Sequence, residues 1–214
     1  MKKIYLAKSN LLLLTLVCCL FYIKQSNGAT EKPTLFIENK GQVMDVSEKK
    51  RNDIKFTYCA NGTKLFIAND GIYYQFMNAK TAQSIDLHRI DMKLVGASIP
   101  SEVVKGQKSE YFENYYLAGN AALNVHGYAK LTFKNIYPNI DWVIYTKEGV
   151  LEYDFIVHPG GNPNVIKINY SYADKIELTA NGELAITSRL GKLIEGKPHS
   201  FSASSNDADR KSVV

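Results

Sequence analysis

Three acidic residues stand close together in the second half of the sequence: Asp141, Glu152 and Asp154. They fall on two expected strands joined by a hairpin at 147–149, so their carboxylates can face one another. Paired carboxylates serve glycoside hydrolysis or bind calcium. The alternation of polar and apolar residues also allows a simpler interpretation, which we favour, in which Glu152 and Asp154 are solvated acids on the polar face of a strand.

Aromatic side chains form a second group with chemical potential. Tyr73-Tyr74 and Tyr115-Tyr116 are adjacent pairs, and Trp142 is the single tryptophan. Neighbouring residues on a strand point to opposite faces, so each pair turns one ring outward. Carbohydrate-binding modules use such rings as platforms, and Tyr74, Tyr116 and Trp142 are therefore candidates for sugar contact. The alternative is a purely structural role, in which the outward rings cover the surface of a sheet.

The remaining reactive side chains predict neither a catalytic centre nor a metal site. The histidines show no ligand spacing with one another; they are His88, His126, His158 and His199. Cys59 lies in a strand-like stretch, where a buried structural thiol is expected. The sequence contains no G-x-S-x-G elbow and no phosphate-binding loop. We therefore expect no enzyme activity and no cofactor.

The N-terminus is typical of a secretory signal peptide. An apolar stretch, Leu11–Ile23, follows a basic segment and precedes the small residues of 26–28. The stretch is too short for a membrane anchor, which needs about 20 residues. We expect cleavage after Gly28 or Ala29 and export of the rest. Lipidation at Cys18 or Cys19 is the less favoured alternative, because no small residue precedes either cysteine.

Charge argues against a nucleic-acid partner. Residues 1–28 hold four lysines and no acid, so cleavage lowers the formal net charge from +5 to +1. A nucleic-acid footprint needs clustered basic residues on the mature surface. The run Lys49–Arg51 is flanked by Glu48 and Asp53, which is typical of a solvated loop. Other surface proteins or glycans are the expected partners, with no transmembrane segment after cleavage.

From Thr34 onward, short apolar runs alternate with turn signals. Asn61-Gly62 and Asn181-Gly182 are strong hairpin signals. About ten or more strands at spacings of roughly 8–12 residues predict an all-β fold, an antiparallel β-sandwich built of short hairpin-connected strands. We assign residues 29–198 to this domain and 199–214 to a polar, disordered tail of a truncated chain.

Three stretches need separate interpretation. The apolar parity of Ser84–Val95 changes near His88-Arg89, which indicates either a β-bulge with His88 in it or a break between two strands. The polar segment Gly106–Tyr111 predicts a loop. Residues Ala121–Val125 are compatible with one helical turn capped by Asn120.

Five sequence segments, which occur in a fixed order, are the basis of a family resemblance. They are Phe36–Gln42, Asn114–Asn120, Asn135–Asp141, Leu151–Phe155 and His158–Pro163. Together they resemble the N-terminal domain of large secreted or surface proteins of Bacteroidetes-type bacteria. That domain typically precedes repeats named for a seven-bladed β-propeller (SBBP), and a sorting domain for gliding-associated type IX secretion often follows.

The resemblance spans roughly Leu35 to Pro198. It implies an exported, non-catalytic structural or interaction module at the cell surface, and it transfers no catalytic residues. The repeats and the sorting domain are absent from this sequence, which makes the periplasm an alternative destination. A carbohydrate-binding or carbohydrate-active β-sandwich protein is the alternative function, motivated by the acids and the aromatic pairs.

Overall fold

The computed structural model describes residues 35–200 apart from 61, 82–83, 118–119 and 148. Strands dominate this part of the chain, and its helical content is the single 3-10 turn η2 (Pro163–Val165). Every strand ladder is antiparallel. The prediction of an all-β antiparallel fold is confirmed. Within the described residues, no helix has the length and apolarity that a membrane span requires.

Residues after the first turn form a meander of four strands. They are β2 (Ile54–Ala60), β3 (Thr63–Ala68), β4 (Gly71–Thr81) and β5 (Ser84–Leu94). Strands β2 and β3 pair as a hairpin with Ala60 opposite Thr63, as predicted, although Asn61 of the turn lies outside the described residues. Ile54, Phe56 and Tyr58 are buried as the period-2 pattern requires.

The longest strands follow the meander. They are β6 (Glu102–Leu117), β7 (Asn120–Tyr137), β8 (Ile140–Lys147) and β9 (Val150–Val157). The short strand β1 (Phe36–Glu38) pairs with β2 on one side and with β7 on the other. One sheet results, with β10 (Ile168–Ser171) at its far end and the order β10-β5-β4-β3-β2-β1-β7-β8-β9, while β6 also pairs with β7.

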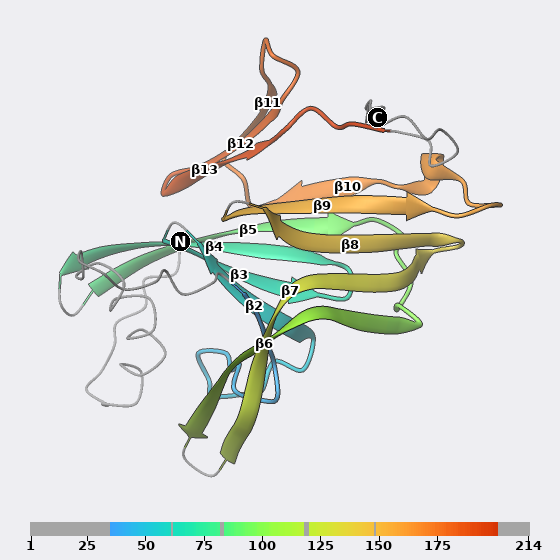
Figure 1. The fold of residues 1–214 in the computed structure, drawn as a ribbon. Helices are drawn as coiled ribbons and strands as arrows, with labels where there is room; N and C mark the ends of the chain where they lie inside the picture. The colour runs from blue at the N-terminus through green and yellow to red at the C-terminus, as the bar shows by residue number, and fades with distance from the viewer. Residues whose placement is uncertain (1–34, 61, 82–83, 118–119, 148, 201–214) are drawn as a thin grey trace.

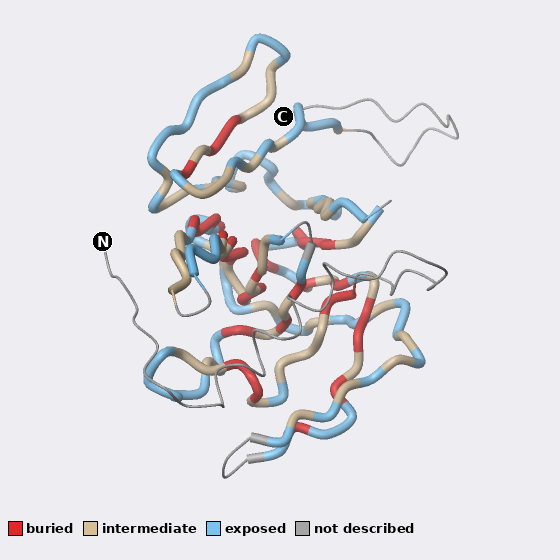
Figure 2. The backbone as a smooth tube through the Cα atoms, turned by 90° about the vertical axis from the view of Figure 1, so that its left-hand side faces the viewer, coloured by how far each residue is buried: buried red, intermediate tan, exposed pale blue. Residues whose placement is uncertain are grey.

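This large sheet curls into a half-barrel whose inner side holds the main core (Figure 1). Its largest fully buried side chains include Trp142, Phe133 and Phe36. The rings of Phe133 and Trp142 lie 5.1 Å apart between centroids. Figure 2 shows the buried segments gathered at the centre of the molecule. Aromatic residues suit this position because each buries a large apolar area.

A second, three-stranded sheet covers part of the half-barrel. It contains β11 (Lys175–Leu178), β12 (Leu184–Ser188) and β13 (Gly191–Glu195), and we call it sheet C. Ile186 of β12 is fully buried in the main core. Arg189 forms two hydrogen bonds, of 2.5 and 2.6 Å, with the carboxylate of Asp86 in β5. The finer expectation of a β-sandwich stays a prediction, because the main sheet is curled.

Two local predictions are wrong in the same region. Ala121–Val125 is not a helical turn but part of β7, and Gly106–Tyr111 is not a loop but part of β6. The two strands pair along nearly their whole length, so cross-strand pairing overrides the weak local pattern. A register shift near Asn124, which has a φ of 51°, accounts for the irregular spacing of the apolar residues.

Two further expectations need correction. The ladder between β4 and β5 is regular through His88 and Arg89, so there is neither a bulge nor a break at this point. The parity changes because the first half of β5 is only half-buried, whereas Ile90, Met92 and Leu94 are buried. Cys59 is exposed rather than buried, since alternation places it on the face opposite Tyr58.

We predict that the close approach of β1 to β7 tolerates no side chain at Gly127. A Cβ there would lie 2.7 Å from Cδ1 and 2.8 Å from Cβ of Leu35. Gly127→Ala should lower the free energy of unfolding by about 1–3 kcal/mol, measured by urea denaturation. Gly106→Ala, in the neighbouring β6–β7 ladder, is the matched control, because the nearest contact of its Cβ would be an ordinary 3.5 Å. Equal stability of the two variants would contradict the prediction.

Candidate functional site

The three candidate acids lie on one face of the β8–β9 hairpin. In the ladder, Tyr145 is opposite Glu152, Val143 is opposite Asp154, and Asp141 is opposite Ile156. Their common parity places these residues on the outer face of the half-barrel, since the intervening Trp142 and Ile144 belong to the core. The sequence argument therefore identified a shared face, but the contacts below divide the acids into two groups.

Asp141 is the buried member, with 2% of its side chain exposed. One carboxylate oxygen accepts hydrogen bonds from Lys134 Nζ at 2.6 Å and from His158 Nε2 at 2.9 Å. The other oxygen accepts from the backbone N–H of Asn135 at 2.9 Å. Burial alone would raise the pKa of Asp141, but these hydrogen bonds outweigh it and lower the pKa. Asp141 thus anchors the β7–β8 turn and the residue that follows β9.

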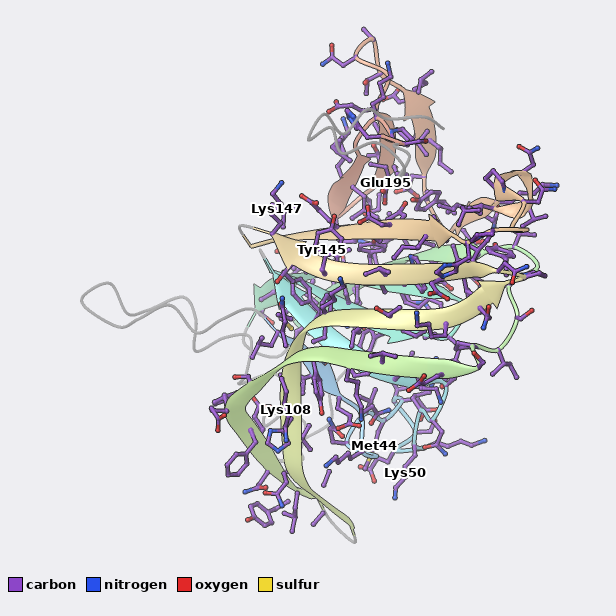
Figure 3. The ribbon with its side chains drawn as sticks, turned by 45° about the vertical axis from the view of Figure 1, so that its right-hand side comes forward. Met44, Lys50, Lys108, Tyr145, Lys147 and Glu195 are labelled. Atoms are coloured by element: carbon purple, nitrogen blue, oxygen red, sulfur yellow. The ribbon has the colours of Figure 1, made fainter. Side chains whose placement is uncertain are left out.

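Glu152 and Asp154 instead flank the phenol of Tyr145. Asp154 is exposed, and Glu152 and Tyr145 are half-buried. Burial raises the pKa of Tyr145, and the charges of Asp154 and Glu152, which also accept hydrogen bonds, raise it further. Figure 3 shows Tyr145 on the sheet beside the β8–β9 turn. A half-buried ring between two carboxylates, with Lys130 opposite it in the ladder, is a surface that can donate and accept hydrogen bonds.

The three aromatic candidates lie apart from this face, and two of them, Tyr74 and Trp142, belong to the main core. Trp142 is fully buried, and Tyr74 is 6% exposed. Tyr116 is 71% exposed on the projecting β6–β7 hairpin. Trp142 Nε1 is buried without a hydrogen-bond partner among the described residues. A glycan bound at the surface would therefore reach Tyr116 but not the two core rings in this conformation.

A half-buried carboxylate that the sequence did not predict lies between sheet C and the main sheet. Glu195 of β13 accepts a hydrogen bond of 3.1 Å from the phenol of Tyr153 in β9. Tyr170 of β10 is also hydrogen-bonded to it. Burial raises the pKa of Glu195, and the two tyrosine hydrogen bonds offset part of the rise. Parity was the available signal, because Glu195 shares its face with the core residue Leu193.

The position of Glu195 gives it a joining role. Strands β9 and β10 are at opposite ends of the main sheet, and Glu195 contacts a tyrosine from each. Figure 3 shows Glu195 between the main sheet and sheet C. The carboxylate therefore connects three separate pieces of the fold at the seam of the half-barrel.

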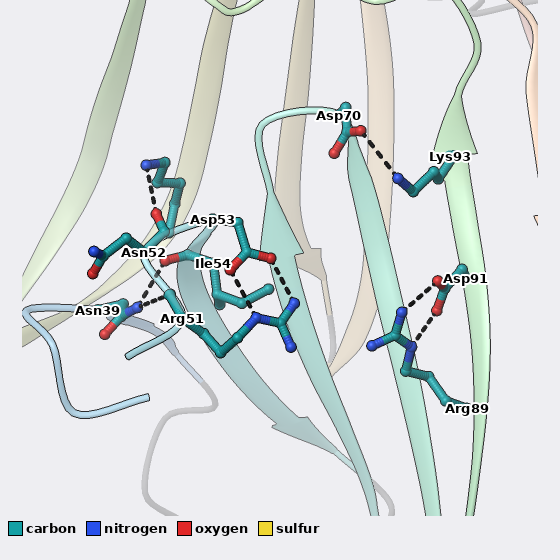
Figure 4. A network of polar contacts seen from close by, with 10 residues as sticks. Asn39, Arg51, Asn52, Asp53, Ile54, Asp70, Arg89, Asp91 and Lys93 are labelled. Carbon is teal, nitrogen blue, oxygen red and sulfur yellow. Dashed lines mark hydrogen bonds and ion pairs between the residues drawn. The ribbon is translucent and has the colours of Figure 1, made fainter. Parts of the chain in front are cut away.

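Charged residues on the outer face of β2–β5 also form structural ion pairs and hydrogen bonds (Figure 4). Arg51 forms a two-point contact with Asp53, and Arg89 does so with the buried Asp91. Arg89 also lies 4.7 Å from the centroid of the Tyr73 ring. Arg89 thus lies over Tyr73, which belongs to a small apolar cluster. Asn39 holds the 39–53 loop at the start of β2, because its side-chain amide donates hydrogen bonds to the backbone oxygens of Arg51 and Ile54.

Three of the four histidines have structural contacts as well. His88 Nε2 lies 2.7 Å from the backbone oxygen of Tyr172, and His158 contacts Asp141. His126 packs against the ring of Phe112 at 5.7 Å. Among the described residues, no group of three or more His, Cys, Asp or Glu side chains is placed to hold a metal ion.

Asp141 and Glu195 should make the stability of the protein depend on pH in opposite directions. The pKa of Asp141 is lowered, so its contribution is lost as pH falls below the ordinary value of 3.8. The pKa of Glu195 is raised, so the folded state keeps a proton that the unfolded chain has released, and stability falls as pH rises above 4.5. Glu195→Gln should abolish that fall, measured by urea denaturation between pH 3 and 8.

Asp141→Asn should reduce the loss of stability at low pH, to which other acids with lowered pKa values such as Asp86 also contribute, and should lower stability at pH 7 by about 1–3 kcal/mol. Asp154→Asn is the control, because this acid on the same face is exposed and its removal should change stability by less than about 0.5 kcal/mol. If the Glu195→Gln variant still loses stability to the same extent as the pH rises above 4.5, Glu195 is not the cause of that loss.

Comparisons with known proteins identify a family without naming a reaction. No curated protein and no solved structure matches the chain. A family model described as a domain of unknown function, DUF7948, matches residues 36–214. The match begins at the first residue of β1 and continues past the predicted domain end at Pro198. Because it covers most of the sequence, the chain belongs to the DUF7948 family.

Proposed function

We propose that this chain is a non-catalytic structural or interaction module of an exported, cell-surface-type protein. The observation that carries the proposal is the use of its buried polar groups. Asp141 anchors a turn, Glu195 joins two strands to sheet C, and Asp91 pairs with Arg89 on the same strand. The surface meanwhile exposes large apolar side chains such as Tyr116 and Leu178, which are suited to contact with other molecules.

Export is part of the proposal and rests on the N-terminal sequence. A basic segment, an apolar stretch and small residues precede β1 in the order that signal peptidase substrates have. The resemblance to the domain that precedes SBBP repeats and type IX sorting domains in Bacteroidetes-type proteins supports delivery to the cell surface. The periplasm is the alternative destination.

Expression of the chain with its own leader in a Bacteroidetes-type host tests this proposal. We expect an exported protein whose intact mass begins at Ala29 or Thr30, because the small residues end there. Cell fractionation distinguishes the surface from the periplasm. A cytoplasmic chain with an intact leader, or a diacylglyceryl group on Cys18 or Cys19, would contradict it.

Carbohydrate binding is the second candidate function. The specific observation in its favour is the half-buried Tyr145 with Glu152 and Asp154 beside it on the outer face. An aromatic ring bordered by hydrogen-bonding groups is the arrangement that sugar-binding surfaces use. We further propose that sheet C and the curled main sheet act as the two layers of a β-sandwich, a common carrier of such sites.

A glycan-array screen followed by calorimetry tests the second candidate. If the Tyr145 face binds a glycan, Tyr145→Ala should weaken binding about tenfold, the equivalent of about 1.4 kcal/mol of lost contact. Tyr172→Ala is the control, because Tyr172 is 68% exposed elsewhere. An array without any bound glycan, or equal losses in both variants, would remove carbohydrate binding from consideration.

A further inference from the structure

Strand β11 is a free edge of sheet C. The sheet order is β11-β12-β13, so β11 pairs with β12 alone among the described strands. All four of its residues are exposed. Figures 1 and 2 show the β11–β12 hairpin projecting from the body of the molecule. An exposed strand edge is a template for pairing with another strand.

The hydrogen-bonding direction of each β11 residue follows from the ladder. Thr179 N–H donates to the backbone oxygen of Glu183 at 2.8 Å. Along an antiparallel strand, the backbone N–H and C=O groups of successive residues point alternately toward one neighbouring strand and away from it. Lys175 and Glu177, which have the same parity as Thr179, therefore form their backbone hydrogen bonds with β12. Ile176 and Leu178 therefore present their N–H and C=O groups at the free edge.

The same two residues carry exposed apolar side chains. Ile176 is 46% exposed and Leu178 is 74% exposed. They share a face with Ile186, which is fully buried in the main core. Sheet C thus extends its apolar face beyond the part of the half-barrel that it covers, and this extension ends at β11.

The edge of β6 is less suitable for pairing. The β6 ladder is interrupted by register shifts, and Gln107 in β6 has a φ of 53°. Such irregularities deter the addition of a strand. By contrast, the β11–β12 register runs without a shift from Lys175 to Leu178.

We propose that β11 pairs with β11 of a second copy of this chain, antiparallel about a two-fold axis at Ile176. This register joins the two Ile176 residues by a pair of backbone hydrogen bonds. It also places Lys175 of each copy opposite Glu177 of the other, on the outer face. An edge lysine normally deters pairing, but here the second copy offers it a carboxylate.

Charge selects this register over its neighbour. A two-fold axis at Glu177 would place the two Glu177 carboxylates directly opposite each other, which is unfavourable. Within one copy, Lys175 Nζ and Glu177 Oε2 lie 2.5 Å apart with both side chains largely exposed, so this pair is worth little in the monomer. It can exchange partners without a large cost.

The dimer is a weak one. A four-residue edge and two apolar side chains per copy make an interface at the small end of specific contacts, so we expect a dissociation constant between about 1 μM and 1 mM. The two-fold arrangement closes on itself and forms dimers rather than filaments. The proposal rests on the interaction role proposed above, and it names the partner as a second copy.

A charge-exchange experiment tests the pairing. Lys175→Glu leaves only acids at the two positions, and Glu177→Lys leaves only lysines. By sedimentation velocity up to about 1 mM, the exported chain should dimerise, each single variant should associate at least tenfold more weakly, and their equimolar mixture should restore dimers. The double variant Lys175→Glu/Glu177→Lys should dimerise like the original. Lys50→Glu, an equal charge change on an exposed lysine outside sheet C, should have no effect.

The possible results of this experiment show whether a second copy of the chain pairs with the edge of β11. A chain that stays monomeric at about 1 mM overturns the proposal, and coverage of β11 by residues 201–214 of the same chain would give that result. Dimers that all variants form equally also overturn it, because the contact would then lie elsewhere. Neither result bears on export or on glycan binding, which have their own measurements.

Discussion

The main sheet depends on the three residues of β1. Its ladders to β2 and to β7 are the connection between the meander β2–β5 and the hairpins β6–β9. Phe36 is fully buried and packs against Tyr58 at 5.1 Å between ring centroids. Gly127 lets β1 approach β7 closely. A segment too short to be stable alone therefore determines whether one curled sheet forms or two separate ones.

Because the main sheet curls, its aromatic interior must also be covered. The two ends of the sheet, β9 and β10, do not pair with each other in the observed strand order. Sheet C lies over this seam and buries Ile186 in the core. Glu195 completes the closure with hydrogen bonds from Tyr153 and Tyr170. Burial of a carboxylate is unfavourable unless it is hydrogen-bonded, and the two phenols satisfy that need.

Polar chemistry in this protein is thus concentrated where pieces of backbone meet. Asp141 fixes the turn between β7 and β8, and Arg189 ties sheet C to Asp86 of β5. The surfaces left for recognition are of a different kind: the outer face around Tyr145, the projecting hairpin with Tyr116, and the edge of β11. This separation of structural from exposed groups is consistent with a binding module.

The sequence by itself determined the strand content, most hairpins and the shared face of Asp141, Glu152 and Asp154, because period-2 alternation and Asn-Gly turns act over a few residues. It did not determine the extent of β6 and β7, whose local patterns are weak until they pair. Nor could it show that Trp142 lies in the core, that Cys59 is exposed, or that Glu195 meets Tyr153. These depend on which distant strands become neighbours, and only the tertiary structure decides that.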